Sequence, residues 1–155
     1  MEICYFSMEH DLRENKLLRA VKRALPSKQI KTFSDIDKLK ENLEVSEGSR
    51  TVAVLVALTE DALLDIYCIH HVFHSVSTIL ILPDNDEDFQ ALAYRMKPNF
   101  LFYANSREDD IVSIISEITG ETRKMTTINE RRVHKSIENT TSVTPHYFED
   151  RVSNL

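Results

Sequence analysis

The residues best suited to chemistry in this sequence gather between Cys68 and His74. Cys68, His70, His71 and His74 are all side chains that bind zinc in proteins. His70 and His74 are four positions apart, so a helix would bring both imidazoles to one face. No acidic third ligand and no glutamate-flanked zinc motif lies beside them. We therefore interpret the group as a helix surface, with His70 and His74 as the candidate metal ligands.

An acidic run from Asp84 to Asp88 suggests a different metal, because carboxylates bind calcium. A calcium loop needs glycine at its sixth position and a bidentate glutamate at its twelfth. Phe89 and Arg95 occupy those positions here. We interpret the run as the start of a helix, where carboxylates favour the positive end of the dipole.

The glycine content limits which nucleotides the chain could bind. Gly48 and Gly120 are its two glycines, and both P-loops and dinucleotide-binding turns need glycine-rich loops. No Ser-His-Asp or Cys-His arrangement can be assembled from the sequence. We therefore expect neither enzymatic activity nor a cofactor.

Charge and hydropathy bound the partners and the compartment. The net charge of −6 argues against direct nucleic-acid binding, because a phosphate backbone repels it. No apolar run approaches the roughly 20 residues that a membrane helix needs, and the start of the sequence resembles no secretory signal. Cys4 and Cys68 both lie in apolar stretches, so we expect reduced thiols in a cytoplasmic protein.

The elements that must position these residues follow from periodicity. Residues 51–58 carry no charge and are rich in β-branched side chains, which predicts a strand covered on both faces. Four more strands are predicted at residues 3–7, 29–33, 78–82 and 100–103. Helical spacing predicts a helix after each strand, with Asp11, Ser34 and Ser106 as N-caps. The third of these helices is expected to continue from Thr59 through Phe73.

Strand and helix alternate five times in residues 1–120, which predicts a doubly wound α/β fold. We expect a five-stranded parallel sheet in the flavodoxin-like order 2-1-3-4-5, flanked by five helices. Residues 121–155 are polar, and their first half is basic. We expect this segment to be a C-terminal tail that is partly helical or disordered, and not a second domain.

This layout resembles the receiver domain of bacterial response regulators over residues 1–120. The resemblance implies a site at the carboxyl ends of the strands. Receivers place an acidic pair after the first strand to hold Mg²⁺ and a phosphoacceptor Asp at the end of the third. A Ser or Thr after the fourth strand and a Lys after the fifth contact the phosphoryl oxygens. Mg²⁺ and the Lys ammonium offset the negative charge of the phosphoryl group.

Those positions carry other residue types in this sequence. The first strand is followed by Ser7 and Met8, with Glu9 as the one nearby carboxylate. The remaining positions hold Ala57, Thr59, Leu82, Pro83 and Tyr103. The chain therefore resembles an atypical pseudo-receiver that keeps the fold without a phosphoacceptor site.

The resemblance suggests a signalling or regulatory module of a two-component system that acts by docking to a protein partner or as a homodimer. The face that receivers use for docking would include Ala91, Arg95, Phe100, Tyr103, Arg107 and Asp110. Phe100 stands where receivers often carry a rotating aromatic, although core packing is the simpler interpretation.

Two alternative functions remain open. One is a switch that responds to a small ligand or metal near Ser7, Glu9, Thr59, Asp84 and Tyr103. The other is the regulatory domain of a transcription control system whose DNA-binding part lies on another protein.

Overall fold

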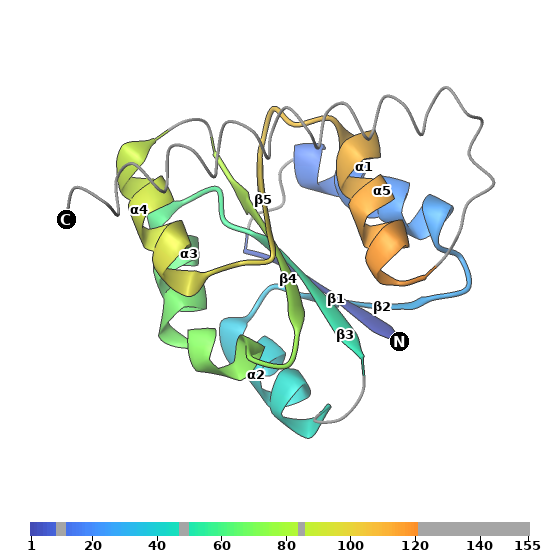
Figure 1. Cartoon of the computed structure of the whole chain (residues 1–155), viewed down its shortest axis with the longest axis horizontal. Helices are drawn as coiled ribbons and strands as arrows, with labels where there is room; N and C mark the ends of the chain where they lie inside the picture. The colour runs from blue at the N-terminus through green and yellow to red at the C-terminus, as the bar shows by residue number, and fades with distance from the viewer. Residues whose placement is uncertain (9–11, 47–49, 84–85, 121–155) are drawn as a thin grey trace. The chain divides into compact units, whose positions relative to one another are not determined.

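The computed structural model describes residues 1–8, 12–46, 50–83 and 86–120, with residues 12–15 as backbone alone (Figure 1). Five parallel strands form one sheet in the order β2-β1-β3-β4-β5, so the predicted fold class and strand order are confirmed. The strands are β1 (Glu2–Ser7), β2 (Gln29–Phe33), β3 (Thr51–Val56), β4 (Ser77–Leu82) and β5 (Phe100–Tyr103). The predicted tail, with Glu9, Asp11 and Asp84, lies outside the described residues.

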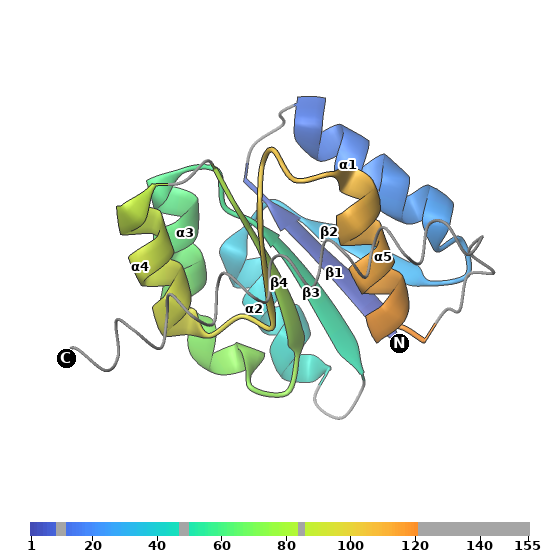
Figure 2. The same cartoon turned by 45° about the horizontal axis from the view of Figure 1, so that its top comes forward.

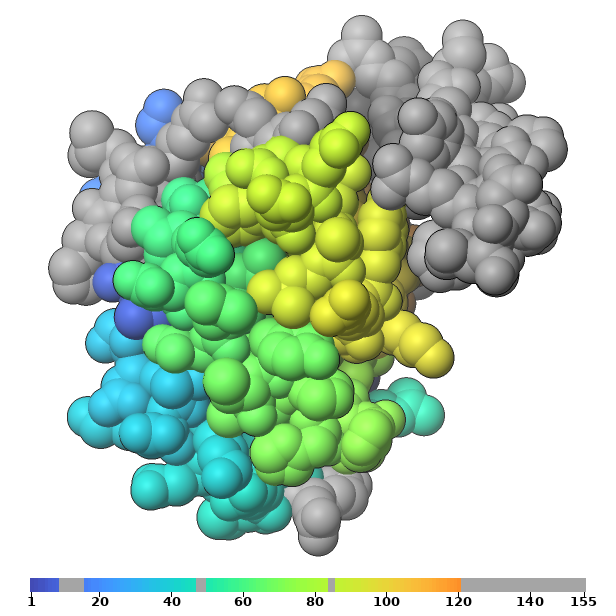
Figure 3. Space-filling model, turned by 90° about the vertical axis from the view of Figure 1, so that its left-hand side faces the viewer, coloured from blue at the N-terminus to red at the C-terminus, as the bar shows by residue number. Residues whose placement is uncertain are grey.

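Helices cover both faces of the sheet (Figures 1 and 2). One face is covered by α1 (Leu12–Ala24) and α5 (Glu108–Ile118). The other is covered by α2 (Ile36–Val45), α3 (Glu60–Cys68), the short 3₁₀ helix η1 (His70–Phe73) and α4 (Glu87–Met96). Figure 3 shows α3 and α4 side by side on this second face.

The central strand β3 is buried at all six positions, as its uncharged sequence predicts. Successive side chains of a strand point to opposite faces of the sheet. Alternate residues therefore pack against the helices on one face or on the other. Cys4, Phe6, Leu55 and Leu80 belong to the cluster beneath α2, α3 and α4. Among the described helices, none combines the length and the apolar character needed to cross a lipid bilayer.

A polar network ties α2 to the amino-terminal half of β1. The Asn42 amide donates to Glu2 Oε1 over 2.9 Å, and Lys31 Nζ lies 3.2 Å from Glu2 Oε2. Lys31 also donates to Asn42 Oδ1 over 3.1 Å. The Cys4 thiol completes the group, with its Sγ 3.4 Å from Glu2 Oε1. These bonds link strands β1 and β2 to the helix that packs on them.

Two predicted N-caps are wrong by one residue. Asp35, not Ser34, caps α2, because its carboxylate accepts the Asp37 amide over 2.9 Å. Arg107, not Ser106, precedes α5 and makes no side-chain cap hydrogen bond. The Ser106 hydroxyl instead accepts the Tyr103 amide over 3.0 Å and closes the turn after β5. In both places a hydroxyl lies just outside the helix that it was expected to cap.

The predicted third helix is too long. It ends at Cys68, and the chain tightens into η1 because the Ile69 amide donates back to both Ile66 and Tyr67 carbonyls. Cys68 is exposed although it lies in an apolar stretch, and the apolar Leu64 is 42% exposed. The chain leaves α5 at Gly120, which adopts a left-handed φ of 73° and donates its amide to the Glu117 carbonyl.

Candidate functional site

The carboxyl ends of β1, β3, β4 and β5 meet at one edge of the sheet. Ser7 pairs with Val56, Val56 with Ile81, and Leu82 with Tyr103. In parallel α/β sheets, this edge is where ligands bind. The structure therefore brings together the described residues that stand at the receiver phosphorylation-site positions, namely Ser7, Met8, Ala57, Thr59, Leu82, Pro83 and Tyr103.

Several of these side chains have a structural role at the edge. Ala57 and Leu82 are completely buried in the core beneath α3 and α4. Backbone bonds extend the sheet here, since the Ala57 amide donates to the Ile81 carbonyl over 2.8 Å. Thr59 caps α3, with its hydroxyl accepting the Ala62 amide over 3.2 Å. Met8 is 41% exposed, so it adds an apolar group to the surface of the edge.

Tyr103 is the polar side chain at the end of β5, where the resemblance implies Lys. Its ring packs against the core cluster, and its hydroxyl accepts the Gln90 side-chain amide over 3.1 Å. Burial raises the pKa of Tyr103, and the nearby Tyr94 raises it further, although the Gln90 hydrogen bond opposes both. Tyr103 is therefore a neutral phenol at physiological pH and supplies no positive charge.

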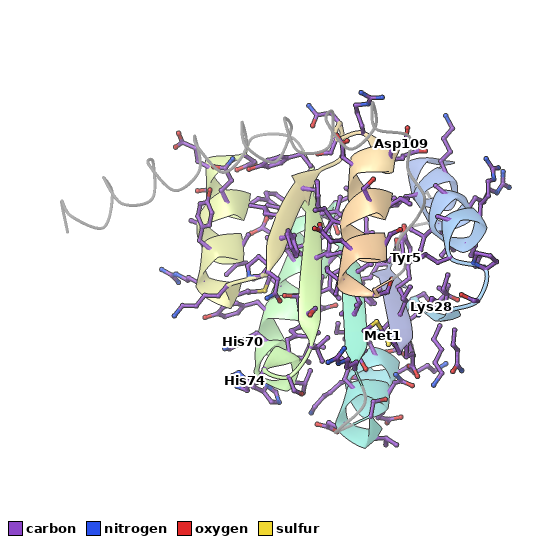
Figure 4. The ribbon with its side chains drawn as sticks, turned by 45° about the vertical axis from the view of Figure 1, so that its right-hand side comes forward. Met1, Tyr5, Lys28, His70, His74 and Asp109 are labelled. Carbon is purple, nitrogen blue, oxygen red and sulfur yellow. The ribbon has the colours of Figure 1, made fainter. Side chains whose placement is uncertain are left out.

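A pocket of about 420 Å³ opens at the same edge, on the side of α1 and α5. Its apolar wall includes Tyr5, Leu17, Val56, Leu58, Ile81 and Ile111. Its other wall is the β5–α5 connection and the first turn of α5, from Ala104 to Asp109. Figure 4 labels Tyr5 on β1 and Asp109 on α5. Sequence reasoning missed this pocket, because its walls come from four strands and two helices with no shared motif.

The histidine cluster lies at the opposite end of α3 (Figure 4). His70 is in η1 and His74 follows it, so the two do not share an α-helical face as predicted. The His70 ring stacks on Tyr67 with centroids 5.0 Å apart, and its Nδ1 lies 2.7 Å from the Tyr67 carbonyl. Within the described residues, no group of three or more potential ligands could hold a metal ion.

The predicted docking face runs over α4, β5 and α5. Ala91, Arg95 and Arg107 are exposed, and Asp110 is partly exposed. β5 is an edge strand, and all four of its residues, Phe100 and Tyr103 included, are half-buried. The face therefore combines an incompletely covered aromatic strand with charged side chains on the two flanking helices.

The fold matches that of solved response-regulator receiver domains. A receiver protein from Burkholderia phymatum superposes with a TM-score of 0.57 and 12% identity, over 81% of this chain and 100% of that one. An atypical orphan response regulator, described as having a phosphorylation-independent regulatory mechanism, matches with a TM-score of 0.55 and 7% identity, over 79% and 98%. The CheY-like protein TadZ from Pseudomonas aeruginosa PAO1 matches with a TM-score of 0.52 and 15% identity, over 76% and 99%.

These superpositions show that the chain shares the fold of receiver domains. No family model matches the sequence, and no curated protein matches it either. The function must therefore be argued from the site.

Proposed function

We propose that this chain is a receiver-like regulatory module that acts by protein docking and is not phosphorylated on aspartate. The observation that carries the proposal is the chemistry at the strand ends. Ala57 closes the central strand as a buried methyl group, and Tyr103 ends β5 as a neutral phenol bonded to α4. Phosphoryl transfer to a receiver needs a carboxylate acceptor and positive charge around the phosphoryl group. Neither residue supplies these.

The same side chains support a site whose conformation does not change with phosphorylation. In this proposal Tyr103 is held on Gln90, so β5 and α4 keep one relative arrangement without a phosphoryl signal. A module of this kind controls its partner by being present or absent. The atypical orphan regulator described as phosphorylation-independent shares this fold, which makes such a mechanism a reasonable precedent.

The docking surface in this proposal is the face of α4, β5 and α5. Its partner is a signalling protein or a second copy of the chain, which would cover the half-buried edge strand β5. We expect Arg107→Glu and Asp110→Lys together to weaken binding at this face while leaving the circular dichroism spectrum unchanged. Lys38→Glu with Glu41→Lys on α2, where both residues are exposed, also leaves the net charge unchanged and is the matched control.

An NMR titration tests whether the site responds to a phosphoryl mimic. Beryllofluoride with Mg²⁺ imitates an aspartyl phosphate in receivers that have the acceptor. We expect the amide spectrum of this chain to remain unchanged at concentrations that shift a working receiver. Specific shifts at the ends of β3 and β5 would contradict the proposal.

The pocket supports a second candidate, a switch that responds to a small ligand. Its volume of about 420 Å³ lies within the range of small-molecule sites. The wall from Ala104 to Asp109 comprises the connection between β5 and α5 and the first turn of α5, so an occupant would contact segments that adjoin the docking face. A thermal-shift panel of metals, nucleotides and small apolar metabolites tests this candidate, and a flat panel would count against it.

A further inference from the structure

The part of α1 whose side chains are described, from residue 16 to residue 24, has a basic outward face. Between residues 16 and 24 its exposed side chains are Lys16, Arg19, Lys22 and Arg23, and all four are cations. Leu17, Val21 and Ala24 face the core between them. The ion pairs among the described residues are Lys31 with Glu2 and Lys40 with Glu44. The four cations of this basic stripe take part in neither pair.

The other face of the sheet carries the complementary charge. The first turns of α3 and α4 are acidic, because helix N-termini favour carboxylates. Together with the partly exposed Asp65, the two helices present Glu60, Asp61, Asp65, Asp86, Glu87 and Asp88. Leu64 lies between Asp61 and Asp65 in α3 and is 42% exposed. This acidic patch therefore has an apolar side chain within it, as interface centres often have.

We propose that the basic stripe on α1 of one copy docks on the acidic patch of α3 and α4 of a second copy. The helices α1 and α3/α4 cover opposite faces of the sheet (Figures 1 and 2), so one molecule cannot pair its own two surfaces. The contact is heterologous, because it joins two different surfaces. One of the two copies keeps a free patch and the other a free stripe, so further copies can add head-to-tail and the assembly is open rather than a closed dimer. It goes beyond the docking face of α4, β5 and α5 and does not depend on it.

The assembly is weak and sensitive to salt. Exposed ion pairs contribute little individually, and the net charge of −6 on each chain opposes association. Salt screens the repulsion between the net charges of two chains when the Debye length is shorter than the distance between their centres. The attraction between stripe and patch remains as long as the Debye length exceeds the separation of an ion pair. We therefore expect association at moderate ionic strength and its loss at about 1 M salt, where the Debye length is about 3 Å.

Sedimentation velocity on the full chain tests the proposal. At about 0.1 M salt, we expect the weight-average sedimentation coefficient to rise with protein concentration, and the rise to disappear at high salt. Lys16→Glu with Arg23→Glu should abolish the rise. The control is Lys38→Glu with Arg50→Glu, which changes the net charge equally at exposed positions off the stripe and should retain salt-dependent association.

A mixing experiment makes the test specific. Asp61→Lys with Asp88→Lys should also weaken association, because it removes two thirds of the net negative charge of the patch. Mixing this variant with Lys16→Glu/Arg23→Glu should give heterodimers, because the unaltered stripe of the first variant can dock on the unaltered patch of the second. A wild-type chain that stays monomeric at every salt concentration would overturn the proposal. So would a mixture that fails to associate, or association that Arg107→Glu/Asp110→Lys abolishes and the stripe variant does not.

Discussion

The side-chain amide of Gln90 on α4 lies 3.1 Å from the hydroxyl oxygen of Tyr103, the last residue of β5. This hydrogen bond connects the end of the edge strand to the helix beside it. It occupies the place where the resemblance to receivers implies a lysine that contacts a phosphoryl group. The relationship therefore joins the proposed inactive site to the proposed docking face.

Removing the Tyr103 hydroxyl should cost stability through Gln90. We expect Tyr103→Phe to lower the free energy of unfolding by about 1 kcal/mol, the usual contribution of one hydrogen bond. In a double-mutant cycle with Gln90→Ala, measured by urea unfolding, the two changes should be non-additive. Strict additivity would show that the hydrogen bond contributes nothing.

Placing an acceptor carboxylate at the end of β3 should destabilise the fold. Ala57 is completely buried, so Ala57→Asp places an ionisable group in an apolar core. We expect a loss of about 2–5 kcal/mol in the free energy of unfolding. Leu58→Asp, one residue later and partly exposed, is the control and should cost less. Equal losses would mean that the strand end tolerates a carboxylate.

The two cysteines should differ sharply in reactivity. Burial, with the hydrogen bond and charge of Glu2, raises the pKa of Cys4 to about 12, whereas Cys68 is exposed. Thiolate is the reactive form, so iodoacetamide at pH 8 should modify one thiol in the folded chain and both in denaturant. Cys68→Ser should abolish the labelling of the folded chain. Rapid labelling of Cys4 would contradict the polar network around Glu2.

Acid should weaken the fold partly through Glu2. Burial alone would raise its pKa, but the hydrogen bonds from Asn42, Lys31 and Cys4 and the charge of Lys31 lower the pKa overall from its ordinary value. A lowered folded-state pKa stabilises the fold above the unfolded value, and this stabilisation is lost as the pH falls through the folded value. Stability measured from pH 6 to about pH 3 should therefore fall less steeply for Glu2→Gln. Glu44→Gln, in an exposed pair with Lys40, should behave like wild type.

The two candidate caps of α2 can be separated by mutation. Asp35→Ala removes the carboxylate that accepts the Asp37 amide and should cost about 1 kcal/mol. Ser34→Ala should change the free energy of unfolding little, because Asp35 rather than Ser34 caps the helix. Thermal or urea unfolding of both variants makes the comparison. A larger loss for Ser34→Ala would reverse the assignment.

The sequence predicted the sheet better than the helix ends. The bounds of β2 and β5 agree with the structure, because charge-free or alternating runs report burial directly. Two caps were missed by one residue. Ser34 stands beside Asp35, whose carboxylate accepts the amide instead, and the Ser106 hydroxyl accepts the Tyr103 amide in the preceding turn. The early end of α3 depends on how Ile69 and His70 bond to its last carbonyls, which no periodicity encodes.

The sequence predicted where the candidate site lies but not its side-chain contacts or its pocket. The strand order alone brings Ser7, Ala57, Leu82 and Tyr103 to one edge. The Gln90 bond to Tyr103 needs the packing of α4 on β5, so no sequence pattern could indicate it. The pocket near Tyr5 depends in the same way on side chains that converge only in three dimensions.

The most direct test of the central claim is the intact mass of the chain after incubation with acetyl phosphate and Mg²⁺. A working receiver run in parallel verifies that the phosphodonor is active. The account predicts that the mass of this chain does not change under conditions that phosphorylate the reference protein. An added phosphoryl group that hydroxylamine removes, as expected of an acyl phosphate, would contradict it.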